Sequence, residues 1–195
     1  MLKLRKIAVT GGIASGKSTV CRLLQKHQAY IVDTDTIVHQ LLASDTSVKE
    51  KVIQIFGQEV ETKGKIDRKK LANKVFSNKQ KLLQLESIIH PHVFQRIEEI
   101  YQKIKREGRY KYFVVEIPLL FETKKQKEFD FVICVDATDE NIAKRTPEPI
   151  AQRTKRLLPI QEKIALSDYV VENNGSMQDL KSQITTIMQE IDSKQ

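Results

Sequence analysis

The sequence predicts an α/β fold in which a five-stranded parallel sheet is flanked by helices, and two observations support this prediction. Five short β-like runs are spread along the 195-residue chain, and most of them are continuously apolar. Continuous runs are typical of strands buried on both faces, as in a parallel sheet covered by helices. Helical patterns lie between the runs, which is the order of an α/β sandwich. The predicted strands are residues 7–9, 30–32, 113–115, 131–135 and 169–171.

Two amphipathic patterns predict helices that pack on this sheet. Between Ser18 and Gln28, apolar side chains recur at helical spacing. Near the end of the chain a second set shares one helical face: Leu180, Ile184, Ile187, Met188 and Ile191.

One long interval, from Thr34 to Lys111, contains no convincing strand. Asp67 is placed to cap a helix, and Asn78 is placed to cap a longer one in which Pro91 predicts a kink or break. The interval is too long for a simple crossover between parallel strands. We therefore expect a helical insertion at the edge of the sheet, a common place for an acceptor pocket.

Composition narrows the class of protein. The chain has no apolar run of about eighteen residues, so no membrane span is expected. Its N-terminal segment is too short and too charged for a signal peptide. Cys21 and Cys134 lie in apolar contexts without metal-ligand spacing, which favours buried, reduced thiols in a cytoplasmic protein. The net charge of +8 suggests a polyanionic partner, either nucleic acid or phosphate-rich substrates, but a generally basic surface explains it equally well.

A phosphate-binding loop follows the first predicted strand. The residues Gly11-Gly12-Ile13-Ala14-Ser15-Gly16-Lys17-Ser18 match G-x-x-x-x-G-K-[ST] without exception. The glycines allow a tight turn whose N–H groups form an anion nest at the start of a helix. Lys17 is expected to contact the β- and γ-phosphates, Ser18 to ligate Mg²⁺, and Thr19 to support the α-phosphate. This loop predicts ATP or GTP binding without distinguishing a kinase from an ATPase or GTPase.

Carboxylates end three of the predicted strands. Asp33 would lie near the γ-phosphate if its strand neighbours that of the loop, and there it could accept a proton from an attacking hydroxyl. We assign helix capping mainly to Asp35 instead. Glu116 could reach the metal through water or simply face solvent. For Asp136 we favour a helix cap or structural partner.

The phosphate-binding loop, the strand-end aspartates and several other motifs occur along the chain in the order that is typical of the dephospho-coenzyme A kinase family, and the sequence resembles this family. The more specific motifs are His90-Pro91 and Pro118-Leu119-Leu120-Phe121-Glu122, since the phosphate loop alone is widespread. The resemblance covers nearly the whole chain. Its other motifs include Val32-Asp33-Thr34-Asp35, Phe56-Gly57, Gly64-Lys65-Ile66-Asp67-Arg68, Val75-Phe76, Leu85-Glu86, Ser167-Asp168-Tyr169-Val170-Val171 and Asn173-Asn174-Gly175.

The resemblance implies a P-loop kinase that uses ATP and Mg²⁺ to phosphorylate the ribose 3′-hydroxyl of dephospho-coenzyme A, the final step of coenzyme A synthesis. Asp33 is then the expected base. The acceptor would be bordered by His90, Pro91, Pro118, Leu119 and Glu122, and for His90 a local cap in a helix break is the alternative. Asn173 and Asn174 would lie near the adenine, and they also suit a turn with Gly175. ATP-contacting residues would be Gly11, Gly12, Ala14, Ser15, Gly16, Lys17, Ser18 and Thr19, and metal ligands Ser18 and Glu116.

By the same resemblance, the single kinase domain has a core of residues 1–40, 112–140 and 164–195, an acceptor-binding insertion at about 41–111 and a lid at about 141–163. The lid departs from the family pattern, because Pro147 and Pro149 interrupt it soon after Arg145. Either the lid is trimmed or a stretch is absent from the sequence. Arg153 is the best candidate for a lid arginine that stabilises the transferred charge, with Arg145 second and a solvated basic helix face as the alternative.

Two other functions compete with this prediction. One is a different small-molecule or nucleoside-monophosphate kinase on the same core. The other is a nucleotide-gated ATPase or GTPase that binds nucleic acid, which is disfavoured because no Asn-Lys-x-Asp motif is found and the basic residues are dispersed. We therefore predict a cytoplasmic monomer that acts on a small molecule, without a nucleic-acid or membrane partner.

Overall fold

The computed structural model describes residues 3–76, 78–146 and 157–194. The chain divides into two compact units, one formed by Met1–Val32 with Ile104–Gln195 and the other by Asp33–Lys103. The first contains the large sheet, and the second is mostly helical.

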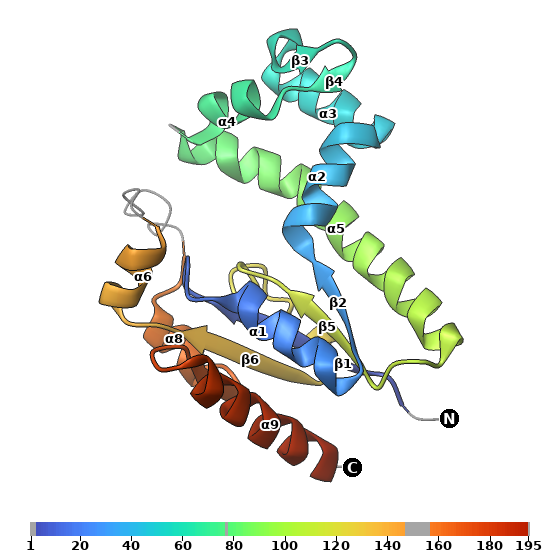
Figure 1. Cartoon of the computed structure of the whole chain (residues 1–195). Helices are drawn as coiled ribbons and strands as arrows, with labels where there is room; N and C mark the ends of the chain where they lie inside the picture. The colour runs from blue at the N-terminus through green and yellow to red at the C-terminus, as the bar shows by residue number, and fades with distance from the viewer. Residues whose placement is uncertain (1–2, 77, 147–156, 195) are drawn as a thin grey trace. The chain divides into compact units, whose positions relative to one another are not determined.

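The five predicted strands are all confirmed and form one parallel sheet with the order β2-β5-β1-β6-β7 (Figure 1). Strand β1 lies at the centre, where Val9 stands opposite Glu116 of β5 and Ile133 of β6. Because β5 separates β2 from β1, the adjacency on which we based the position of Asp33 is wrong. The strands span Arg5–Gly11 (β1), Ala29–Asp33 (β2), Tyr112–Glu116 (β5), Phe131–Asp136 (β6) and Tyr169–Glu172 (β7).

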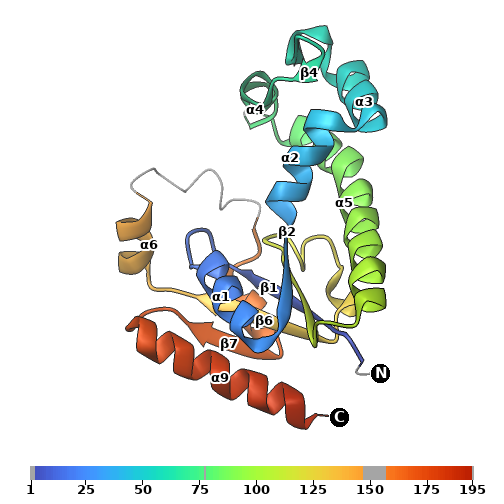
Figure 2. The same cartoon turned by 45° about the vertical axis from the view of Figure 1, so that its right-hand side comes forward.

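Successive side chains of a strand point to opposite faces of the sheet, and helices pack against the apolar side chains there. On one face, Ile7 and Val9 pack with apolar residues of α1 (Lys17–Leu24) and α9 (Met177–Ser193), the two amphipathic helices predicted from sequence (Figure 2). Ser176 begins α9 with a capping box to Asp179. The short helix α8 (Ile160–Ala165) packs against β1 and β6. Helix α6 spans Asp139–Arg145, and the 3₁₀ turns η1 and η3 span Gln25–His27 and Gln126–Glu128.

The second unit begins with α2 (Thr34–Ser44) and α3 (Thr46–Phe56) and ends in the long helix α5 (Lys79–Glu107), whose last residues belong to the first unit. The predicted caps are present: Asp67 accepts hydrogen bonds from the first backbone N–H groups of α4 (Arg68–Phe76), and Asn78 from those of α5. Between α3 and α4 lie η2 (Gln58–Val60), β3 (Glu61–Thr62) and β4 (Lys65–Ile66).

Two expectations for this unit are wrong. The interval is not free of strands, since β3 and β4 pair as an antiparallel hairpin of two residues each, too short to show alternation in the sequence. Of the kink or break that we expected at Pro91, the break is wrong, because helix α5 continues through this residue. The helix on either side of the proline is long enough to keep its remaining hydrogen bonds, so the local loss is absorbed.

None of the helices in the described parts of the chain is both long and apolar enough to cross a membrane.

Both cysteines are buried thiols, as the sequence predicted. Burial raises the pKa of the Cys134 thiol to about 11, because the surrounding sheet cannot solvate a thiolate.

We expect neither thiol of the native protein to react with Ellman's reagent at pH 8 within minutes, and both to react at once in denaturant. Rapid labelling of Cys134 in the native protein would contradict its placement in the sheet.

Candidate functional site

The phosphate-binding loop connects the end of β1 to the start of α1, and its glycines occupy backbone positions that other residues resist. Gly11 has φ of 143° and Gly16 has φ of 98°. A Cβ atom on Gly16 would collide with the side-chain nitrogen of Asn173, and one on Gly11 with the carbonyl oxygen of Val135. Both glycines are therefore required by conformation and by close packing.

The carbonyl groups of the loop are held from outside by distant residues. One guanidinium nitrogen of Arg145 donates to Ala14 O at 3.2 Å and to Ser15 O at 3.1 Å, and Asn173 Nδ2 donates to Ser15 O at 2.8 Å. In a trans peptide the C=O and N–H point in opposite directions. The N–H of Gly16 is therefore directed away from Arg145 and Asn173, as an anion nest requires, whereas that of Ser15 donates within the loop to Gly12 O at 3.4 Å.

Three further groups in the loop suit a phosphate chain. Lys17 is 8% exposed and its Nζ donates to Gly12 O at 2.7 Å, which holds the cation across the loop. Ser15 Oγ is buried and has no hydrogen-bond partner among the described residues. Helix α1 begins after Gly16, which has no side chain to cap the first backbone N–H groups, so its positive end can face an anion. The loop can therefore bind several anionic oxygens at once.

A hydroxyl and a carboxylate lie next to this loop. Ser18 Oγ donates to Glu116 Oε1 at 3.0 Å. Both are hard oxygen donors of the kind that Mg²⁺ prefers, so the pair fits a magnesium ion. In the described residues no cluster of three or more His, Cys, Asp or Glu could hold a metal alone. An ion here would depend on phosphate and water oxygens for its remaining ligands.

The turn between β7 and α9 is anchored by the two predicted asparagines. Besides its bond to Ser15, Asn173 donates its backbone N–H to Asp136 O at 2.8 Å, and Asn174 Oδ1 accepts from Thr138 N at 2.7 Å. The side chain of Asp136 accepts from Ala137 N, which is a structural role. The cap of α6 is Thr138 rather than Asp136.

In the second unit, Asp33 is the N-cap of α2. Its Oδ1 accepts from Asp35 N at 2.9 Å and its Oδ2 from Thr36 Oγ1 at 2.8 Å. Our assignment of the cap to Asp35 is wrong, because Asp35 already lies in the first turn of the helix. A carboxylate has about four lone-pair sites, so these two bonds leave Asp33 able to accept another proton donor.

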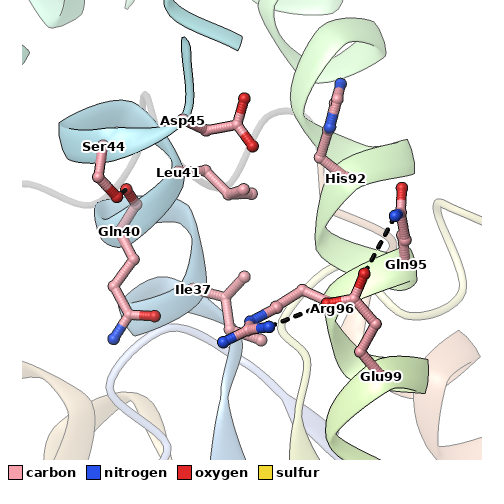
Figure 3. A pocket seen from close by; sticks show the side chains of 9 residues that line it. All are labelled: Ile37, Gln40, Leu41, Ser44, Asp45, His92, Gln95, Arg96 and Glu99. Carbon is pink, nitrogen blue, oxygen red and sulfur yellow. Dashed lines mark hydrogen bonds and ion pairs between the residues drawn. The ribbon is translucent and has the colours of Figure 1, made fainter. Parts of the chain in front are cut away.

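The same unit contains a cavity of about 290 Å³ between α2 and α5 (Figure 3). The predicted residues His90 and Pro91 lie within α5, but neither lines this cavity, and the alternative of a cap at a helix break is wrong for His90 because the helix is continuous there. The residues that line the cavity recur at i, i+4 spacing on the two helices, a pattern that any solvent-exposed helix face also shows, so sequence reasoning missed the cavity. Its lining is Ile37, Gln40, Leu41, Ser44, Asp45, His92, Gln95, Arg96 and Glu99.

The predicted acceptor residues of the segment after β5 lie in different environments. Leu119 is half-buried, and the carbonyl of Pro118 accepts from Lys163 Nζ at 2.8 Å. Glu122 forms an ion pair with the same ammonium group at 2.8 Å. Lys163 was missed by sequence reasoning, because it looks like one more charged residue of a short helix.

The two lid arginines have different outcomes. Arg145, which we ranked second, lies at the end of α6 and also donates to Asn173 O at 2.9 Å. Arg153 lies outside the described residues.

Three comparisons identify the relatives of this chain. A family model described as dephospho-CoA kinase matches residues 5–179. A dephospho-CoA kinase from Protochlamydia amoebophila is 40% identical, with 98% of each chain covered, and one from Carboxydothermus hydrogenoformans is 39% identical, with 97% of this chain and 95% of the relative covered.

Solved structures agree with these matches. A Thermus thermophilus crystal structure superposes with a TM-score of 0.79 at 28% identity, covering 96% of this chain and 98% of the other. Dephospho-CoA kinase from Campylobacter jejuni gives 0.70 at 30% identity, covering 95% and 96%. A shikimate kinase from Acinetobacter baumannii gives 0.52 at 16% identity, covering 100% and 96%, and shares the fold alone.

Replacing Gly16 with alanine tests the geometry of the loop. A non-glycine residue forced into this region costs about 1–3 kcal/mol, and the methyl group also meets Asn173. We expect the Tm of Gly16→Ala without nucleotide to fall by at least about 2 °C, and its ATP affinity to fall as well.

The matched control is Gly12→Ala, whose added Cβ meets no atom within 4 Å. Its Tm should stay close to that of the wild type. Equal Tm values for the two variants would show that the backbone at Gly16 is not constrained.

Proposed function

Because the chain belongs to the dephospho-CoA kinase family, it is a kinase that uses ATP to phosphorylate dephospho-CoA in the last step of coenzyme A biosynthesis, and we propose here which residues carry this reaction. The observation that supports the assignment most strongly is the phosphate-binding loop, whose carbonyls are fixed from outside by Arg145 and Asn173.

We propose that the loop binds the triphosphate of ATP. The N–H groups on the inner side of this loop would contact the phosphate oxygens, and Lys17 would place its cation on the β- and γ-phosphates. Since the loop is held in place before nucleotide arrives, little reorganisation is needed as charge develops on the transferred group. Asn173 and Asn174, which anchor the adjacent turn, are proposed to border the adenine.

Ser18 and Glu116 are the proposed residues for Mg²⁺. A bound ion supplies charge neutralisation between the β- and γ-phosphates. Ser18 would ligate it directly, and Glu116, already hydrogen-bonded to that hydroxyl, would orient the ligand and accept from metal-bound water.

Asp33 is the proposed general base on the ribose 3′-hydroxyl. Its carboxylate is oriented by the first turn of α2, which fixes the direction of its remaining lone pairs. Among the predicted acceptor residues, His90, Pro91, Pro118 and Leu119 remain proposals. Glu122 is proposed to act indirectly, without contacting the acceptor, because its carboxylate faces Lys163.

The cavity between α2 and α5 is a further candidate for acceptor binding. Gln40, Ser44 and Gln95 present amide and hydroxyl groups, and Ile37 and Leu41 give it an apolar wall. Asp45, His92, Arg96 and Glu99 also line it, so the cavity suits a polar part of the acceptor that carries several hydrogen-bonding groups. The helical unit would then bind part of the acceptor distant from the reacting hydroxyl.

We also propose the finer features that the sequence suggested. These are a lid at about 141–163 with Arg153 stabilising the transferred phosphoryl group, an acceptor-binding insertion at about 41–111, and a cytoplasmic monomer. The buried thiols Cys21 and Cys134 suit a reducing compartment. Gel filtration with light scattering measures the oligomeric state.

Substituting Asp33 with asparagine tests the mechanism in an ADP-release assay with dephospho-CoA. Asparagine caps helices about as well as aspartate, so the fold of α2 is retained while the base is lost. We expect turnover to fall by at least about a hundredfold while ATP affinity is unchanged. Near-normal turnover would remove Asp33 from the mechanism.

Two controls accompany this assay. Asp35→Asn changes a carboxylate two residues away and should keep most of the activity. Wild-type protein is run over a panel of acceptors that includes nucleoside monophosphates. No turnover with dephospho-CoA, but turnover with another acceptor, would overturn the assigned function.

The metal site is tested by Ser18→Ala. Removal of a direct ligand should raise the Mg²⁺ concentration needed for half-maximal activity by at least about tenfold. The adjacent substitution Thr19→Ala is the comparison, since it should weaken ATP binding without changing the Mg²⁺ requirement. An unchanged Mg²⁺ titration in Ser18→Ala would exclude this serine as a ligand.

A further inference from the structure

A charged side chain is completely buried beside the sheet. Lys163 in α8 is 1% exposed, although it carries an ammonium group. Lysine is almost never fully buried unless it is paired, because its charge loses the solvation of water. Its surroundings must therefore compensate the ammonium group.

Three bonds converge at this point. Lys163 Nζ lies 2.8 Å from Glu122 Oε1 and donates to Pro118 O at 2.8 Å. The same Glu122 oxygen accepts the backbone N–H of Leu158 at 2.9 Å. The cluster thus joins α8, Leu158 just before its N-cap Pro159, and both ends of the segment Pro118–Glu122.

The cluster also reaches the start of the phosphate-binding loop. Pro118 O lies 3.5 Å from the hydroxyl of Thr10, the residue before Gly11. On the other side of Lys163, its own backbone oxygen accepts from Ser167 Oγ at 2.7 Å. Lys163 is therefore held at both ends, and it cannot move without displacing the Pro118 carbonyl.

The physical reason for a buried ion pair here is not stability alone. Desolvation of two charges offsets most of their attraction, and apolar residues of similar size often stabilise a core equally well. What apolar residues lack is direction, since hydrogen bonds to a carbonyl and a carboxylate fix the orientation of both.

We propose that Lys163 is a positioning residue that holds Pro118–Glu122 in the conformation required to bind the acceptor. This inference rests on the proposed function of the chain as a dephospho-CoA kinase. Glu122 is the intermediate in this arrangement: its carboxylate turns inward to Lys163 and Leu158, and the backbone of the segment is thereby fixed for the substrate.

The test is the double variant Lys163→Met/Glu122→Gln. Removing both charges avoids leaving either one buried alone, and glutamine keeps an oxygen for the N–H of Leu158. We expect the KM for dephospho-CoA to rise at least about tenfold, while the dissociation constant for ATP stays within about twofold.

A control separates positioning from stability. Ile184→Val removes a methylene from the core at α9 without touching the cluster, and it should lower the Tm with no change in the KM for the acceptor. If the double variant likewise lowers the Tm and leaves the KM unchanged, Lys163 is only structural and the inference is overturned.

The wild type distinguishes the two possible failures. Wild-type protein that does not phosphorylate dephospho-CoA overturns the proposed function, and the inference with it. An active wild type with an unaffected double variant overturns the inference alone.

If the double variant does not fold, hydrogen exchange on the wild type decides. Addition of dephospho-CoA should slow exchange together at the amide of Leu158 and at those of Thr123, Lys124 and Lys125, which donate to carbonyls of residues 119–121. Slowing at residues 123–125 with no change at Leu158 would show that the segments are not coupled, and would overturn the inference.

Discussion

The outward anchoring of the Ala14 and Ser15 carbonyls is the interaction on which the nucleotide site depends. A loop of consecutive peptides can point its N–H groups at a phosphate only if something else satisfies the carbonyls on its outer side. Here Arg145 and Asn173 do so, from positions more than a hundred residues further along the chain. The loop therefore takes its geometry from the whole sheet, because β6 leads to Arg145 and β7 leads to Asn173.

The same dependence explains which features were predictable from the sequence. The strands could be predicted because continuous apolar runs are a local consequence of burial on both faces, and the helix caps Asp67 and Asn78 because capping acts over three residues. The phosphate loop could be recognised because the positive φ angles at Gly11 and Gly16 are a local property of the backbone, and they favour glycine. The bonds from Arg145 could not, since no local pattern distinguishes a lysine or arginine in solvent from one that holds a distant carbonyl.

The errors have physical causes of the same kind. Strand order depends on pairing between distant segments, so nothing near β2 indicated that β5 would separate it from β1. Asp33 and Asp35 both suit an N-cap. Asp33 is the cap because it ends β2 and is therefore extended, with φ of −103° and ψ of 117°. Lys163 has the sequence neighbours of a surface lysine, Glu162 among them, and its burial arises only when α8 packs on β1 and β6.

Lys163 and Asp33 show two ways in which an ionised side chain is oriented in this protein. Asp33 is directed by its own neighbours, Asp35 and Thr36, so its geometry survives any change that preserves the first turn of α2. Lys163 is directed by groups 41 to 45 residues away in the sequence, Glu122 and the Pro118 carbonyl, and it directs them in turn. A locally oriented carboxylate remains available to an incoming proton donor, which the role proposed for Asp33 requires. A mutually oriented buried pair has no such freedom, and its rigidity suits the role proposed for it, which is to hold the backbone of Pro118–Glu122 in one conformation.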